Sequence, residues 1–483
     1  MKKKILYFFP HNPFPPRTGA HRRCLEIFSG LRELGCEIHF ASSSISSETQ
    51  WNDSSVAALK AKHVKSVRIY EGSPDDKRFV KLLWSAYSLA KEGNSNNEIR
   101  DGQKTTSSVR ELVQNINPEA LCRKYSGFTS WCSGKRFEGF LKTADWKMAR
   151  VLSEILSMRA ESNAPLDSMI HTPPDFRRWF NQCLEEVRPD LMMMSYAHWD
   201  GLFDHKKFVS TMRVIDYLDL VSLNTAMQRA LLQRLENSSD VSTIDEAVLK
   251  EDFFDKLNLT IDERELAIFD RYDQAIAINP KEAEQIRQKA SHTKLSYLPV
   301  TLEPYPIENV YTGPALFPLG PNPFNLQGYL YFAHKVMPEI RKVIPEFSLD
   351  VTGSFYWNKL PAVVDGINLR GFVPDLADLY RTCRFVVCPV LGGTGQQIKI
   401  VEAMAHGVPV IATRFSAASS PIEHGNNGFV ANDAKEFAEY VVILWNDRSL
   451  CERLGEAARE TIASKFSRPR LLNELSNIVG PLH

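Results

Sequence analysis

The sequence of 483 residues lacks the marks of several large classes of protein. Its 58 basic and 58 acidic residues balance, so extensive binding to nucleic acid is not expected. No apolar run approaches the length of a membrane span. The eight cysteines are scattered without a Cys-x-x-Cys pair, and we expect those such as Cys24 and Cys388 to be buried and reduced. These absences predict a cytoplasmic protein.

Two short motifs are also missing. The turn after the first predicted strand, residues 4–9, is not Gly-x-Gly-x-x-Gly, which argues against a simple NAD enzyme. No Asp-x-Asp triad is present to chelate a cation bound to a diphosphate, so no metal site is predicted. The basic and then apolar start, residues 1–10, is too short for a signal peptide and reads as a strand.

The patterns that are present alternate between strands and helices. Residues 4–9 and 36–41 read as strands, and residues 20–34 between them have helical spacing. This is a βαβ unit of the kind that opens a doubly wound parallel sheet. The length allows two or three domains, and the proline-dense stretch 300–313 predicts a hinge between them.

The most informative stretch is residues 383–413. An apolar, β-branched run at 385–390 predicts a buried strand, and residues 391–395 form a glycine-rich turn. Residues 396–405 have helical spacing, ended by Gly407, and the next strand follows. A turn of this kind presents free backbone N–H groups to a ligand, and the helix dipole adds partial positive charge there.

Two charged residues on the predicted helix extend this site. Lys399, one turn into the helix, could meet a phosphate, and Glu402 lies on nearly the same face. A carboxylate there can accept hydrogen bonds from the vicinal hydroxyls of a ribose. The pattern therefore suggests a nucleotide-sugar site. The plainer alternative is a surface ion pair between Lys399 and Glu402.

This stretch resembles the donor-site signature of the retaining glycosyltransferases of family 4, which have the GT-B fold. The matching run is Gly393-Thr394-Gly395-x-x-x-Lys399-x-x-Glu402-Ala403-Met404-Ala405-x-Gly407-x-Pro409-Val410. The resemblance implies that Glu402 holds the ribose and that Gly393, Thr394, Gly395 and the adjoining Gln396 lie at the donor sugar and diphosphate. Many members carry a glutamate where Thr394 stands, so half of their Glu-x7-Glu pair is missing here.

The first loop, residues 15–23, resembles the first loop of the same family. The resemblance implies that Gly19 lets the backbone approach the donor phosphate and that Arg23 contributes to the donor site. Ala20 stands where a second glycine is common. The alternative for Arg22 and Arg23 is a solvated start of a helix.

A histidine follows the apolar strand predicted at 191–196. His198 matches in type a histidine that family members carry there, and the resemblance implies a role near the reacting sugar. Asp219 follows the next strand, but Leu218 stands where the family often has another histidine. The alternatives are a loop histidine at 198 and a helix cap at Asp219.

The implied architecture is α/β, with two Rossmann-like doubly wound parallel sheets facing a cleft. Residues 1–305 would form the acceptor-side domain, with a mostly helical insertion at about 70–172, and 306–465 the donor domain. Residues 466–483 would form a helix that crosses back to the first domain.

The implied function is a retaining transfer of a sugar from a nucleoside-diphosphate sugar to a hydroxyl of a glycan or glycolipid, without metal or cofactor. Lys399 and His198 are the candidate catalytic residues. Envelope polysaccharide synthesis is the usual setting for the family, and peripheral contact with the inner face of a membrane is a further expectation. Two alternatives remain open. One is a GT-B protein that binds nucleotide sugar without catalysis, as a partner or scaffold, and the other is a nucleotide-sugar epimerase.

Overall fold

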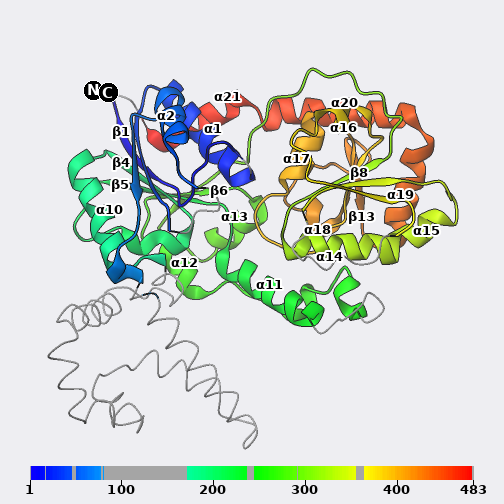
Figure 1. Cartoon of the computed structure of the whole chain (residues 1–483), viewed down its shortest axis with the longest axis horizontal. Helices are drawn as coiled ribbons and strands as arrows, with labels where there is room; N and C mark the ends of the chain where they lie inside the picture. Colours follow the sequence, from blue (N-terminus) through cyan, green and yellow to red (C-terminus); the bar gives the residue numbers. More distant parts are fainter. Residues whose placement is uncertain are drawn as a thin grey trace, which may run out of the picture. The chain divides into compact units, whose positions relative to one another are not determined.

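The computed structural model describes residues 2–16, 18–45, 50–77, 80, 171–236, 244–290, 292–354 and 364–480. Most of the predicted insertion at 70–172 lies outside these residues. The chain forms two compact units, and both termini belong to the first (Figure 1). The first unit comprises residues 1–69, 187–197 and 205–483, and the second comprises residues 70–186 and 198–204.

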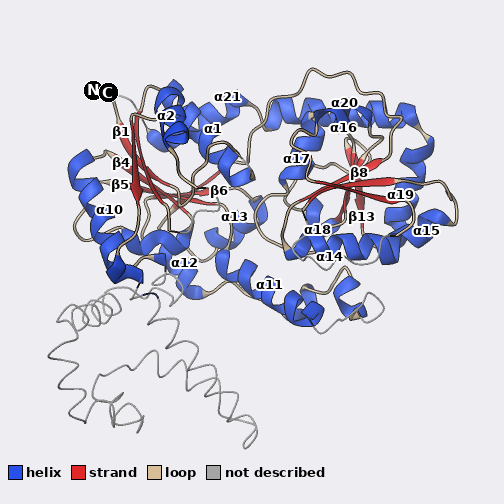
Figure 2. Cartoon of the chain, viewed as in Figure 1, coloured by secondary structure: helices blue, strands red, loops and turns tan. Residues whose placement is uncertain are grey.

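The first unit is built on two separate sheets, drawn as red arrows in Figure 2. The first sheet has the order β3-β2-β1-β4-β5-β6-β7. Its strands are β1 (Lys4–Phe8), β2 (Glu37–Ser43), β3 (Ser66–Tyr70), β4 (Leu191–Ser195), β5 (Met212–Tyr217), β6 (Gln274–Ala277) and β7 (Lys294–Tyr297). From β2 through β7 every neighbouring pair is parallel. The strand order reverses beside β1, which is the arrangement of a doubly wound sheet.

The second sheet has the order β10-β9-β8-β11-β12-β13, and every pair in it is parallel. Its strands are β8 (Ala315–Leu319), β9 (Leu349–Gly353), β10 (Ile367–Gly371), β11 (Val386–Cys388), β12 (Val410–Thr413) and β13 (Gly428–Ala431). Here the order reverses between β8 and β11, so the loops after these two strands flank the usual ligand position. The predicted α/β class with two doubly wound sheets is confirmed.

The helices of this unit alternate with the strands. They are α1 (Gly19–Glu33), α2 (Asp53–Lys62), α11 (Val221–Glu236), α12 (Glu263–Phe269), α13 (Pro280–Arg287), α14 (Pro323–Tyr331), α15 (Met337–Arg341), α16 (Ala377–Thr382), α17 (Ile398–Ala405), α18 (Arg414–Ala417), α19 (Ala434–Asn446), α20 (Arg448–Lys465) and α21 (Arg468–Val479). Short turns of helix are η3 (Glu246–Leu249), η4 (Asp255–Leu257) and the π-helical η5 (Phe332–Val336). Cys24 and Cys388 are buried, as predicted.

A segment from the first half of the chain belongs to the core of the second sheet. We call α11, η3 and η4 together, residues 221–236 and 244–259, the clasp segment (Figure 1). Its apolar side chains, Phe254 among them, share one hydrophobic cluster with β8, β11 and β12. A Cβ atom on Gly392 would lie 2.0 Å from the Phe254 ring, so only glycine permits this contact. This packing was not predicted from the sequence.

The last helix, α21, packs against α1. Leu471, Leu475 and Ile478 join the hydrophobic cluster of the first sheet. Arg468 at the start of α21 also forms ion pairs with Glu26 and Glu33 of α1, at 3.2 and 2.8 Å. Burial of the apolar face supplies most of the stabilisation, because exposed ion pairs contribute about 0–1 kcal/mol each.

In its described residues, the second unit contains α10 (Pro174–Val187) except for its last residue, and most of the 3-10 helix η1 (Ala197–Leu202). The Asp76 carboxylate accepts hydrogen bonds from the N–H groups of Asp175 and Phe176, both at 3.0 Å, and so caps α10. The ring of Phe176 stacks on Tyr70 with centroids 4.4 Å apart.

The last two strands of the first sheet are short. β6 covers only Gln274–Ala277, and β7 follows it after α13. Helix α12, which precedes β6, ends at Phe269 and is capped at its start by Asp262, whose side chain accepts from the N–H of Arg264.

Gly353, at the end of β9, offers a test of this fold. Its φ is +105°, and a Cβ atom there would lie 1.9 Å from the carbonyl oxygen of Leu319 in β8. Gly353→Ala should therefore cost clearly more free energy of unfolding than the roughly 1–2 kcal/mol of backbone strain alone. Gly371→Ala is the matched control, since Gly371 has a φ of +68° but no atom within 4 Å of the added Cβ. Urea denaturation measures both, and equal losses would contradict the close approach of β8 and β9.

Candidate active site

The glycine-rich turn follows β11 at the carboxyl end of the second sheet. Gly393 and Gly395 have φ values of +120° and +73°, which favour glycine. A Cβ atom on Gly395 would also lie 2.7 Å from the Asp219 carboxylate. Helix α17 begins at Ile398, two residues later than predicted, because Gly395 is left-handed and Gln397 has a ψ of 83°, outside the helical region.

Lys399 lies in the first turn of α17. It is half-buried, its Nζ donates a hydrogen bond to Oδ1 of Asn325, and it sits 5.1 Å from the ring centroid of Phe317 in β8. Burial lowers its pKa, because the charged ammonium loses hydration. In the described part of the chain no carboxylate forms an ion pair with it. An anionic ligand would supply the missing countercharge.

Glu402 forms an ion pair with an arginine of the first sheet's α1. Its Oε1 lies 2.8 Å from the Nη1 of Arg22, and the two side chains are 17% and 41% exposed. The residue predicted at the donor site was Arg23, the next in the chain. Arg23 instead is 2% exposed, with its guanidinium 2.6 Å from Asp216 and 2.7 Å from the carbonyl oxygen of Leu298. This arrangement gives no support to a donor contact by Arg23, because its charge is already neutralised in the core.

Gly19 lies at the start of α1, against α17. A Cβ atom there would lie 1.7 Å from Cδ1 of Ile398, the first residue of α17. The structure thus brings Gly19, Arg22, Glu402 and the glycine-rich turn into one region of the first unit.

The glycine-rich turn is hydrogen-bonded to residues that follow β5 and β6 of the first sheet. Thr394 Oγ1 donates to Oδ1 of Asp219 at 2.8 Å and accepts from Nδ2 of Asn224 at 2.6 Å. The Gly395 N–H donates to Oε1 of Glu282 at 2.6 Å. Two carboxyl groups therefore face the turn predicted to hold a diphosphate.

Two amides complete these contacts. The Gly395 carbonyl accepts from Nδ2 of Asn279 at 2.9 Å, and Gln396 Oε1 accepts from the N–H of Val300 at 2.8 Å. Gln396, predicted at the donor site, is thus engaged with the connection between the two sheets. Its role toward a donor stays a prediction.

Glu282 was missed in the sequence. It lies in the first turn of α13, after Asn279-Pro280, at the carboxyl end of β6. That position was a usable signal, because the carboxyl ends of parallel strands are where open α/β sheets place their ligands. A single glutamate after Asn-Pro also fits an ordinary helix start, so its role could not be read from the pattern alone.

A cavity of about 620 Å³ adjoins the turn, which is within the usual range for small-molecule sites. Polar residues in its lining include Asn279, Glu282 and Thr394. The clasp segment provides both apolar residues, including Phe254, and polar ones, which are Glu251, Asp255 and Asn258. The remaining lining includes Leu223, Met227, Leu391, Gly393, Gly395, Gln397, Thr413, Arg414, Ser419 and Asn432. Gly393, Thr394 and Gly395 are predicted site residues that line it.

Burial shifts the pKa of both carboxyl groups at the turn. It raises the pKa of Glu282 to about 8, with a further increase from the charge of Asp219, while the Gly395 N–H acts in the opposite direction. It raises the pKa of Asp219 to about 6, against the hydrogen bond from Thr394. A group of this kind in a cavity is a candidate functional residue.

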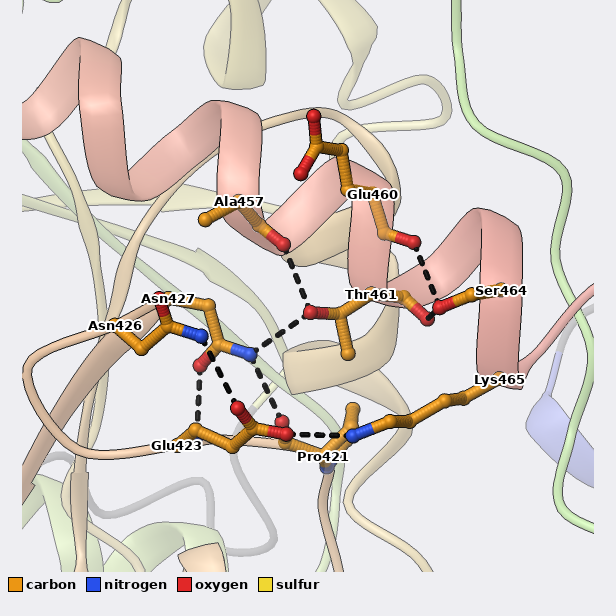
Figure 3. A network of polar contacts seen from close by, with 9 residues as sticks. All are labelled: Pro421, Glu423, Asn426, Asn427, Ala457, Glu460, Thr461, Ser464 and Lys465. Carbon is orange, nitrogen blue, oxygen red and sulfur yellow. Dashed lines mark hydrogen bonds and ion pairs between the residues drawn. The ribbon is translucent and has the colours of Figure 1, made fainter.

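The loop between β12 and β13 borders the cavity at residues 414–419 and is held farther along by a polar network (Figure 3). The buried Asn427 side chain donates to Thr461 Oγ1 of α20 at 3.0 Å and to the Pro421 carbonyl at 3.1 Å. Its Oδ1 accepts from the N–H of Glu423, and Lys465 of α20 pairs with the Glu423 carboxylate at 2.5 Å. Because both the amide nitrogen and the amide oxygen of Asn427 are hydrogen-bonded, the network fixes this loop against α20.

His198 lies in η1 and belongs to the second unit. Its ring centroid is 4.8 Å from that of His171 and 5.1 Å from that of Trp199. These contacts describe an aromatic cluster within that unit. The catalytic role predicted for His198 stays a prediction.

Two features are absent from the described residues. No three His, Cys, Asp or Glu side chains there are grouped so that they could hold a metal ion. No helix in the same residues is long and apolar enough to cross a membrane.

Comparison with known sequences finds a family match over the strands of the second sheet. Residues 315–447 match the family described as "Glycosyl transferases group 1". The capsular polysaccharide biosynthesis glycosyltransferase CapM of Staphylococcus aureus is 31% identical over 135 residues, which are 28% of this chain and 34% of CapM. An uncharacterized 44.6 kDa protein in the cps region of Klebsiella pneumoniae is 29% identical over 130 residues, 25% of this chain and 34% of that protein. The chain thus spans about a third of the length of these curated relatives.

Solved structures agree over nearly the whole chain. TarM of S. aureus gives a TM-score of 0.57 at 11% identity, with 100% of this chain and 99% of that chain covered. Sucrose-phosphate synthase of Thermosynechococcus elongatus gives 0.55 at 13% identity, with 99% and 98% covered. At these identities the likeness concerns the fold. The chain has the predicted GT-B fold, and the predicted resemblance to glycosyltransferases is confirmed by the group 1 match over residues 315–447.

The pKa of Glu282 leads to a prediction about stability. Its folded value of about 8 lies above the ordinary 4.5, so between these pH values the native state keeps a proton that the unfolded state has lost. This contribution is fully present below about pH 4.5 and is lost as the pH rises through about 8, by a few kcal/mol at most. Glu282→Gln has no such group, so its melting temperature should fall less than that of the wild type between pH 5 and pH 9. If the melting temperatures of the two proteins fell in parallel with pH, the pKa assignment would be contradicted.

Proposed function

We propose that the protein is a retaining glycosyltransferase that moves a sugar from a nucleoside-diphosphate sugar to a hydroxyl group of a glycan or glycolipid. The observation that carries this proposal is the glycine-rich turn at 393–395 with Lys399 beside it, a half-buried cation that no carboxylate pairs within the described residues. The relatives support it: CapM is named for capsular polysaccharide biosynthesis, and HepE of Anabaena, similar in fold, was solved in complex with UDP and glucose. The latter comparison has a TM-score of 0.54 at 12% identity, covering 99% of each chain.

The proposed chemistry depends on stabilising the leaving group. As the bond between the anomeric carbon and the diphosphate breaks, negative charge grows on the diphosphate oxygens. The N-terminus of α17 offers backbone N–H groups and about 0.3–2 kcal/mol of favourable electrostatic energy. The ammonium group of Lys399, poorly hydrated where it lies, adds a full charge at low cost in reorganisation. The transfer then needs neither a metal nor another cofactor.

Glu402 would hold the ribose in this proposal. In the structure its carboxylate is occupied by Arg22, at 2.8 Å. Arg22 is 41% exposed, so turning its side chain into water costs little. Ribose hydroxyls would then replace the guanidinium on the same carboxylate.

The setting would be envelope polysaccharide or glycolipid synthesis in the cytoplasm, with peripheral contact at the inner face of the membrane. The names of several relatives support this setting, among them a lipopolysaccharide core biosynthesis glycosyltransferase of Rhizobium meliloti that is 37% identical over 71 residues.

A second candidate is a GT-B protein that binds a nucleotide sugar without turnover. The observation in its favour is that the Gly395 N–H and the Glu402 carboxylate both already have partners within the chain. Ligand-induced stabilisation without release of a nucleoside diphosphate would favour this reading.

Release of UDP or GDP from a panel of nucleotide sugars, with and without a crude glycolipid extract, tests the proposed function. The wild type should release nucleoside diphosphate from one donor, and the extract should stimulate that release. Lys399→Ala should lower kcat about 10²–10³-fold with a smaller effect on donor affinity, because the lysine acts on charge that develops in the transition state. Lys435→Ala, an exposed lysine of α19, is the control and should keep full activity. A wild-type kcat for Lys399→Ala would refute the role of Lys399 in stabilising the leaving diphosphate.

Glu402 and Arg22 form a second pair of variants. Glu402→Ala should weaken binding of the free nucleoside diphosphate about 10–100-fold, the usual effect of losing hydrogen bonds to a charged group. Arg22→Ala should leave that affinity unchanged or improve it, because it removes a competitor for the carboxylate. Isothermal titration calorimetry measures both. Unchanged affinity in Glu402→Ala would refute the ribose contact.

A further inference from the structure

Glu282 has one carboxyl oxygen in use and one free. Its Oε1 accepts from the Gly395 N–H at 2.6 Å and from Nδ2 of Asn279 at 3.1 Å. Its Oε2 is buried and has no hydrogen-bond partner among the described residues. The side chain is only 4% exposed. A buried oxygen of this kind costs free energy unless a ligand or ordered water satisfies it.

The cavity that Glu282 lines has the chemistry of a sugar site. Polar residues line it, among them Asn279, Glu282 and Thr394, and the clasp segment adds apolar residues such as Phe254 as well as the polar Glu251, Asp255 and Asn258. A sugar ring has hydroxyl groups at its edge and C–H groups on its faces. It can therefore satisfy polar groups and pack against apolar ones at the same time.

We infer that this cavity is a sugar-binding subsite in which a ring hydroxyl hydrogen-bonds Oε2 of Glu282. The inference rests on the proposed function and names a residue for it that the sequence motifs do not contain. A hydroxyl group suits the site in either protonation state of Glu282, because it can donate to a carboxylate or accept from a carboxylic acid. Because Oε1 of the same residue holds the Gly395 N–H, Glu282 would link the sugar to the turn proposed to meet the diphosphate.

The ring belongs either to the donor's sugar or to the acceptor, and the shared chemistry is a hydroxylated pyranose. Binding is tested first without any transfer. Ligand-observed NMR with methyl glycosides of glucose, mannose, galactose and N-acetylglucosamine, at pH 9 where Glu282 is ionised, reports binding to the full chain. Glu282→Gln keeps an oxygen for the Gly395 N–H but replaces the free carboxylate oxygen with an amide donor. Glu284→Gln, on the exposed side of α13, is the matched control.

The expected result is that one glycoside binds the wild type and Glu284→Gln with equal affinity. Its affinity for Glu282→Gln should be about 10–100-fold lower. Equal binding to all three proteins, or no binding of any glycoside to the wild type, would overturn the subsite. This readout does not require turnover. A protein that binds the glycoside through Glu282 but releases no nucleoside diphosphate would refute the proposed function and keep the subsite.

Kinetics assign the sugar. If the sugar belongs to the donor, Glu282→Gln lowers the affinity for the intact nucleotide sugar about 10-fold or more and leaves the affinity for the free nucleoside diphosphate unchanged. If it belongs to the acceptor, the KM for the acceptor rises by a similar factor and donor affinity is unchanged. Either result supports the subsite. A change of less than twofold in all three quantities would contradict it.

Discussion

The hydrogen bond between the Gly395 N–H and Glu282 is the interaction that holds the site together. It brings a carboxyl group that follows β6 of one sheet against a backbone amide that follows β11 of the other. The turn can lie this close to the first sheet because Gly395 is left-handed and has no Cβ, which would lie 2.7 Å from the Asp219 carboxylate. Burying a carboxyl group is costly, and the raised pKa of Glu282 records that cost. Such strain is typical of residues held in place for function rather than for stability.

The clasp segment sets the surroundings of this interaction. It leaves the first sheet after β5 and buries its apolar face in the core of the second, with Phe254 against Gly392. The cavity beside the turn is thus lined by the clasp segment, by α13 and by the loops after β11 and β12. The network around Asn427 fixes the last of these loops against α20 (Figure 3). A rigid surround of this kind is what positions a ligand without a cost in ordering at the moment of binding.

Parts of the site were readable because they are local. A short apolar run, three glycines in four residues and a helix with Lys399 and Glu402 one turn apart all occur within 385–405. Their arrangement follows from strand, turn and helix geometry, so local sequence is enough to place the turn. Arg23 shows the limit: Arg22 and Arg23 are neighbours in a helix and point about 100° apart, and only packing decides which one is buried with Asp216 and which one reaches Glu402.

The α/β class, the first βαβ unit and the glycine-rich turn were already determined in the amino-acid sequence, because hydrophobic periodicity and turn chemistry act over a few residues. The second doubly wound sheet was implied by the resemblance to a known family. Three-dimensional packing alone decided that Glu282 and Asp219 face that turn, that Arg22 forms an ion pair with Glu402 and that the clasp segment joins the second core. Thr394 and Asp219 are 175 positions apart, and Gly395 and Glu282 are 113. Contacts over such separations leave no periodic pattern in one sequence, because they arise from the burial of whole elements against one another.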